Sequence, residues 1–150
     1  MRVLVISGPN MNLLGEREGG YYGSWTLGEL QDALRKKGQS LDMDVYFFQS
    51  NHEGELVERI QQARDYDYLV VNAAAYTHTS VAIRDALLAL GKPFIEVHMS
   101  NVFAREPFRH RSFLSDIARG VIVGLGPASY LLALEALAFL EEYGSGSGGD

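Results

Sequence analysis

The stretch VLVISGPNMNLLGEREGGYYGSWTLGEL, residues 3–30, connects an apolar run to the start of a helix through a long polar loop. The run Val3–Ser7 is short and continuous, which is typical of a strand buried on both faces of a parallel sheet. Thr26 and Glu29 have the spacing of a capping box, so a helix is predicted to begin there. A strand followed directly by a helix is the building unit of an α/β protein.

The same alternation of apolar runs and helical patterns continues along the chain. Further helices are predicted to begin at a second capping box, formed by Ser50 and Glu53, at Thr79 or Ser80, and at Pro127. Strands are predicted at Val3–Ser7, Val45–Gln49, Tyr68–Asn72, Phe94–His98 and Val121–Val123. The predicted fold is therefore α/β and flavodoxin-like, a doubly wound five-stranded parallel sheet with helices on both faces.

The composition excludes several classes of protein. The chain of 150 residues carries a net charge of −6, which argues against a general nucleic-acid binder or an anionic-membrane binder. It has no cysteine, so disulfides, thiolate catalysis and zinc sites with sulfur ligands are excluded. No apolar stretch approaches the roughly 20 residues of a membrane span, and a cytoplasmic location is expected. Residues 1–143 are predicted to form a single domain, followed by a flexible Gly/Ser tail over residues 144–150.

The loop after the first predicted strand, Ser7–Gly23, is longer than the roughly 2–6 residues that usually join a strand to a helix. It carries Asn10, Arg17 and Tyr22, and its glycines predict a lid that can move. A tyrosine has an ordinary pKa of about 10 and becomes a base near neutral pH only where a cation lowers that pKa. Arg17 is the nearby cation, and Tyr21 stays an alternative to Tyr22 because spacing alone does not distinguish them.

Polar side chains follow three of the predicted strands at the point where each strand ends. The carboxyl ends of parallel strands meet at one edge of a sheet, where ligands of doubly wound folds bind. The loops at the opposite edge are ordinary charged turns. The polar residues expected at the ligand-binding edge are Asn10, Arg17, Tyr22, Asn72, His78, His98, Ser100, Asn101, Arg105 and Arg109.

Within this set, Glu96 and His98 are two residues apart on one predicted strand and therefore face the same side. A carboxylate beside an imidazole fixes its tautomer and favours its cationic form, which is ready to act as an acid. The alternative interpretation is a buried, hydrogen-bonded histidine with a structural role.

Two further patterns allow more than one interpretation. Arg105, Arg109 and Arg111 form a basic cluster in an acidic chain, which indicates either a docking site for a carboxylate or phosphate or a patch of surface salt bridges. The sequence THTS, residues 77–80, precedes a predicted helix. It suits either an anionic oxygen ligand or simple capping by Thr79 or Ser80.

Several long blocks of this sequence resemble the type II 3-dehydroquinate dehydratases. The blocks are SGPNMNLLGEREGGYYG, VVNAAAYTHTSVAIRDAL, PFIEVHMSNVFAREPFRHRSFLS and GVIVGLGPASYLLALEAL, in that order. The resemblance implies a flavodoxin-like fold and a homododecamer built as a tetramer of trimers. It also implies anti elimination of water from 3-dehydroquinate through an enolate, giving 3-dehydroshikimate in the shikimate pathway, without a cofactor or a metal.

The resemblance also implies a role for each matching residue. Tyr22 would take the C2 proton as the base, and Arg17 would keep it ionised. Asn10 would help to hold a water molecule against the enolate oxygen. His98, oriented by Glu96, would protonate the departing C1 hydroxyl.

The remaining matches imply substrate binding. Asn72, His78 and Arg109 would bind hydroxyls, and Ser100 with the backbone around Met99 would hold the carboxylate.

One aspartate and one arginine complete the implied site. Asp85 would reach it from a neighbouring subunit. Arg105 is expected among the substrate-binding residues and could add to the positive charge near Tyr22.

Type I dehydratases use a lysine Schiff base instead. The lysines here, Lys36, Lys37 and Lys92, lie in or next to predicted helix ends, far from the polar edge, which argues against imine chemistry.

Two departures from the family pattern stand out. Gly19 replaces a usual proline, and Ala74 and Ala75 stand where glycines are common. The alternatives to an enzyme of this family are a non-catalytic module that binds a small anion or a nucleotide, and, more weakly, a dinuclear metal enzyme using His78 and His98.

Overall fold

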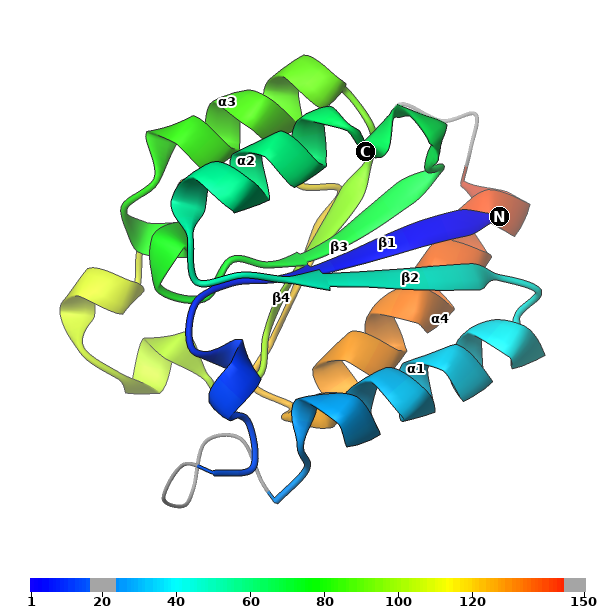
Figure 1. Cartoon of the computed structure of the whole chain (residues 1–150), viewed down its shortest axis with the longest axis horizontal. Coiled ribbons are helices and arrows are strands. Elements are labelled where there is room, and N and C mark those ends of the chain that lie inside the picture. Colours follow the sequence, from blue (N-terminus) through cyan, green and yellow to red (C-terminus); the bar gives the residue numbers. More distant parts are fainter. Residues whose placement is uncertain (17–23, 145–150) are drawn as a thin grey trace.

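The computed structural model describes residues 1–16 and 24–144 and contains a five-stranded sheet in the order β2-β1-β3-β4-β5. All neighbouring strands run parallel. The strands are β1 (Arg2–Ser7), β2 (Asp44–Gln49), β3 (Tyr68–Asn72), β4 (Phe94–His98) and β5 (Gly120–Val123). The flavodoxin-like α/β fold predicted from the alternation of elements is thereby confirmed (Figure 1).

Helices cover both faces of the sheet. They are α1 (Leu27–Ser40), α2 (Glu53–Gln61), α3 (Val81–Leu90) and α4 (Pro127–Tyr143). Helices α1 and α4 lie together on one face, and α2 and α3 lie together on the other (Figure 1). Short 3₁₀ turns fill the connections, at η1 (Met11–Leu13), η2 (Ala63–Asp65), η3 (Ala74–His78), η4 (Val102–Ala104) and η5 (Pro107–Arg109).

The position of β1 inside the sheet, between β2 and β3, explains why its sequence is a continuous apolar run. Val3 and Val5 point into the core beneath α1 and α4, whereas Leu4 and Ile6 point into the core beneath α2 and α3. All of these side chains are buried, since neither face of the strand meets water. Consecutive positions of the strand therefore all have to be apolar, whichever face they point to.

The helix starts agree with the sequence in all but one case. Thr26 and Glu29 form the predicted capping box, and Ser80 caps α3 by accepting a hydrogen bond from the Ile83 N–H. The predicted box at Ser50 and Glu53 is wrong, because His52 occupies the N-cap of α2.

Ser50 instead forms local contacts that remove it from a capping role. Its Oγ accepts from the His52 N–H at 2.9 Å and donates to Glu55 Oε1 at 3.0 Å.

A close backbone approach brings the ends of β1 and β3 together. The Gly8 N–H donates to the Asn72 carbonyl at 2.8 Å. A Cβ atom at Gly8 would lie 2.4 Å from the Ala73 carbonyl oxygen, so only glycine fits. The loops that follow the two strands consequently start side by side at the carboxyl edge of the sheet.

Candidate active site

A polar cavity lies at the carboxyl edge of the sheet, where the sequence predicted a ligand site. Its lining includes the predicted site residues Asn10, Asn72, His78, His98, Met99, Ser100, Arg105 and Arg109. Pro9, Met11, Ala74, Ala75 and Val102 complete the lining. Arg17 and Tyr22, together with Gly19 and Tyr21, lie outside the described residues.

Glu96 and His98 form the pair that their spacing on β4 predicted. Both side chains are buried, and Nε2 of His98 is hydrogen-bonded to Oε2 of Glu96. Because an ionised carboxylate can only accept a hydrogen bond, we assign the shared proton to Nε2 of His98. Nδ1 is then the ring nitrogen that is not bonded to Glu96. His98 also lines the cavity, so this nitrogen is the one available to exchange a proton there.

The Glu96 carboxyl is kept ionised in spite of its burial. Loss of water contact alone would raise its pKa, and this is the largest single effect. Hydrogen bonds from His98, Ser115 and Ser112 and the charge of His98 outweigh it and lower the pKa of Glu96 below its usual range. Ser112 Oγ donates at 2.9 Å and Ser115 Oγ at 2.6 Å.

His78, at the end of η3, is held in one tautomer by the backbone. Its Nδ1 donates to the Arg111 carbonyl at 2.8 Å, which leaves Nε2 with a lone pair. Burial lowers the pKa of His78, the bond to Arg111 opposes this, and the nearby charges of His98 and Arg109 lower it further. His78 is therefore a neutral acceptor at neutral pH.

Asn72, at the end of β3, belongs to a buried network. Its Nδ2 donates to the Tyr130 hydroxyl at 2.9 Å, and its Oδ1 accepts from the Ala74 N–H at 3.1 Å. The Tyr130 hydroxyl also lies 3.0 Å from Ser7 Oγ. The side-chain amide is consequently fixed in one orientation before any ligand arrives.

The basic cluster is divided between the cavity and the surface. Arg105 Nη1 donates to Ser100 Oγ at 3.2 Å, and Arg109 Nε donates to Glu106 Oε1 at 2.9 Å. Both arginines line the cavity, whereas Arg111 is exposed and does not line it. Arg105 and Arg109 thus both pair with Glu106 and still line the cavity, where a ligand can reach them.

Ser80, Asp85 and the lysines do not line the cavity. Ser80 caps α3, so the capping interpretation of THTS is confirmed. Asp85 is exposed on α3 and does not line the cavity. Lys36, Lys37 and Lys92 are likewise absent from the cavity lining.

In residues 1–16 and 24–144, no three His, Asp or Glu side chains converge in a way that could hold a metal ion. No helix in the part of the chain that the structure describes is long and apolar enough to cross a membrane.

The sequence did not reveal the residues that support the site from behind. Ser112 and Ser115 bind Glu96 across 16 and 19 positions, and Tyr130 binds Asn72 across 58. Long-range pairs of this kind have no periodic signature, although the spacing of the serines in HRSFLSD is visible in the sequence.

The chain matches the family described as Dehydroquinase class II over residues 1–138. It is 60% identical over 136 residues to the 3-dehydroquinate dehydratase of Methylococcus capsulatus, covering 89% of this chain and 92% of that protein. It is 57% identical over 137 residues to catabolic 3-dehydroquinase 1 of Aspergillus terreus, covering 91% of this chain and 90% of that protein. The solved type II dehydroquinase of Propionibacterium acnes aligns with a TM-score of 0.88 and 44% identity, covering 92% of this chain and 96% of its own.

Proposed function

The chain belongs to the class II dehydroquinase family, and we propose that it removes water from 3-dehydroquinate to give 3-dehydroshikimate, a step of the shikimate pathway. The observation that carries the proposal is the buried Glu96–His98 pair at a polar cavity on the carboxyl edge of the sheet. Hydroxide is a poor leaving group, so the elimination needs a positioned acid.

His98 is the proposed acid. Glu96 is ionised and bonded to Nε2, which fixes the ring and leaves Nδ1 as the nitrogen that delivers the proton. As the C1–O bond breaks, the departing hydroxyl takes this proton and leaves as water. The pair of electrons from the broken C2–H bond completes the double bond of the enone.

The proposed base rests on the sequence. Tyr22, as a phenolate stabilised by Arg17, takes the C2 proton and generates an enolate. Asn10, which lines the cavity, helps to hold a water molecule against the enolate oxygen. The elimination is anti, so the base and the acid act from opposite faces of the ring.

The remaining residues of the cavity bind the substrate. His78, with its Nε2 lone pair, accepts a hydrogen bond from a substrate hydroxyl, and Asn72 and Arg109 bind hydroxyls as well. Ser100, next to Arg105, holds the carboxylate with the backbone around Met99. These contacts place the C1 hydroxyl beside His98.

The proposed assembly is a homododecamer, a tetramer of trimers, in the cytoplasm. Asp85 contributes to the cavity of a neighbouring subunit. The exposed surface of α3 supports this, since Val81 and Leu88 flank Asp85 at helical spacing with 55% and 53% of their surfaces exposed. Light scattering on fully active protein should give at least a trimer, and a monomer mass would contradict this part of the proposal.

An ultraviolet assay tests the activity directly. Mixing the purified chain with 3-dehydroquinate should produce the absorbance of the conjugated enone, and His98→Gln should abolish most of the rate. A chain that binds the substrate without forming the enone would instead support the small-anion-binding alternative.

A further inference from the structure

The segment Arg111–Asp116, between η5 and β5, contacts the elements that carry both histidines of the cavity. Its Arg111 carbonyl accepts from His78 at 2.8 Å. On its other side, the segment reaches Glu96, the partner of His98. Of the described residues that line the cavity, none comes from this segment, so it acts from behind the histidines.

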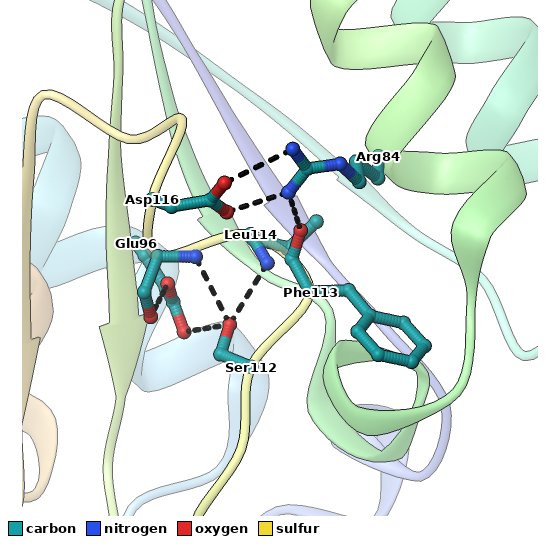
Figure 2. A network of polar contacts seen from close by, with 7 residues as sticks. Arg84, Glu96, Ser112, Phe113, Leu114 and Asp116 are labelled. Atoms are coloured by element: carbon teal, nitrogen blue, oxygen red, sulfur yellow. Dashed lines mark hydrogen bonds and ion pairs between the residues drawn. The ribbon is translucent and has the colours of Figure 1, made fainter.

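The local geometry of Ser112 determines where its hydroxyl proton points. Ser112 Oγ accepts from the Leu114 N–H at 3.0 Å and from the Ser115 N–H at 3.2 Å. Both acceptor sites of the hydroxyl are therefore occupied, and its single proton is directed to Glu96 (Figure 2). The same turn brings Ser115 to the other carboxylate oxygen, Oε1.

The segment is itself clamped to the neighbouring helix. Arg84 of α3 pairs with both carboxylate oxygens of Asp116, at 2.5 and 3.0 Å, and also donates to the Phe113 carbonyl at 2.8 Å (Figure 2). The Phe113 N–H in turn donates to the Thr77 carbonyl at 2.9 Å. A bidentate arginine pair is geometrically restrictive, so it fixes the turn that carries the serines.

We propose that Ser112 and Ser115 are positioning residues for the dehydratase reaction, which hold the Glu96 carboxylate against His98 and are themselves held by the Arg84–Asp116 clamp. This inference rests on the proposed function, since it assigns the serines a part in proton delivery. The serines do not line the substrate cavity and donate to Glu96, so their effect passes through Glu96.

Ser115→Ala is the sharpest test because Ser115 is exposed and the change removes one donor. Removing a group that orients a metal-binding histidine typically costs about 10–100-fold in activity, and Ser115 orients the partner of a histidine in a comparable way. We expect a loss of that order in kcat, with KM changed less than about threefold because Ser115 is not in the cavity. Ser115→Thr keeps the hydroxyl and should restore most of the rate.

The pH profile separates positioning from a general structural defect. Losing a donor makes the Glu96 carboxylate easier to protonate, so the acid limb of kcat should move to higher pH in Ser115→Ala. His98, His78, Arg109, His110 and Arg111 are the titratable or charged groups that line the space beside Glu96. All of them are unchanged in Ser115→Ala, so the shift is assigned to the lost hydroxyl.

The clamp is tested with Arg84→Gln, which should lower kcat in the same way. Two matched controls lie on α1. Ser40→Ala removes a hydroxyl that donates to the Lys37 carbonyl at 2.6 Å, and Arg35→Gln removes an ion pair with Asp32 at 2.9 Å. Both controls should retain the wild-type kcat and pH profile, and light scattering should give the same mass for every variant.

An activity-independent measurement distinguishes failure of this inference from failure of the proposed function. Deuterium exchange at histidine C2, followed by mass spectrometry, should show the protonation midpoint of the Glu96–His98 pair moving upward in Ser115→Ala only. If the wild type turns over substrate but Ser115→Ala keeps its kcat and pH profile, the inference is overturned. Equal losses in Ser115→Ala and Ser115→Thr would also overturn it. If the wild type is inactive, the proposed function fails, and an unchanged midpoint would then overturn this inference as well.

Discussion

The rings of His78 and His98 stack at the wall of the cavity, with centroids 6.2 Å apart and planes inclined by 21°. Two positive charges at this separation repel, so the histidines divide into two protonation roles. Burial and the neighbouring charges lower the pKa of His78, while Nε2 of His98 is bonded to the ionised Glu96. One imidazole is thus an acceptor and the other a donor, although both belong to the same residue type.

The lowered pKa of His78 predicts a loss of stability on acidification. The unfolded chain takes up a proton near the ordinary value of 6.5, but the folded chain does so only at lower pH. The free energy of unfolding should therefore begin to fall as the pH drops below about 6.5. Urea denaturation at several pH values should show this slope in the wild type and a smaller slope in His78→Asn. The exposed His52 offers a control, and a His52→Asn variant with the same reduced slope would contradict the assignment.

The assignment of the base predicts unequal effects at two adjacent tyrosines. Tyr22→Phe removes the proton acceptor but keeps the ring, so kcat should fall by at least about 10²-fold. Tyr21→Phe should cost far less. Turnover at saturating 3-dehydroquinate measures both. A crippled Tyr21→Phe, or a Tyr22→Phe with nearly normal kcat, would show that Tyr22 is not the base.

The backbone at Ala74 predicts that glycine is preferred there. Ala74 has φ 52°, in the left-handed region, which costs an L-residue about 1–2 kcal/mol. Ala74→Gly should relieve this cost, offset by about 0.5–1 kcal/mol of unfolded-state entropy. We expect a net gain of about 0.5–1 kcal/mol in the free energy of unfolding, measured by urea denaturation. Ala75→Gly, at the next position of η3 and without a positive φ, should lower stability instead.

The hydrogen-bond network around Asn72 predicts that substitution of Tyr130, a residue of the core, weakens substrate binding. Tyr130→Phe leaves the buried Asn72 and Ser7 side chains without a shared partner, which should cost about 1–3 kcal/mol of stability. The freed Asn72 amide should also raise KM. Tyr66→Phe is the matched control, since its buried ring loses a hydroxyl that accepts from Arg59 at 2.9 Å, under the opposite helices. An equal rise in KM for both variants would contradict the role given to Tyr130.

The strands were predictable because burial on both faces imposes an unbroken apolar sequence. The Glu96–His98 pair was predictable because two residues on one strand face the same side. In both cases a local rule of geometry determines the contact.

The wrong capping box and the missed serines have different physical causes, one local and one long-range. Ser50 has the right spacing for a capping box, yet its hydroxyl forms other local bonds and the box does not form. The hydroxyls of Ser112 and Ser115 reach a carboxylate on another element, and only the folded loop brings them together. The positive φ of Ala74 could be suspected only from the glycines usual at that position.

The sheet topology also has a consequence for engineering. Met1 precedes β1 and α4 returns along the sheet to Tyr143, so both ends of the described fold lie at the edge opposite the cavity (Figure 1). The length of the strands separates each of these positions from the two histidines. A surface tether or a fluorescent label attached near Met1 or Tyr143 should leave the cavity of the same subunit uncovered, which makes these positions suitable for immobilising the enzyme on a support.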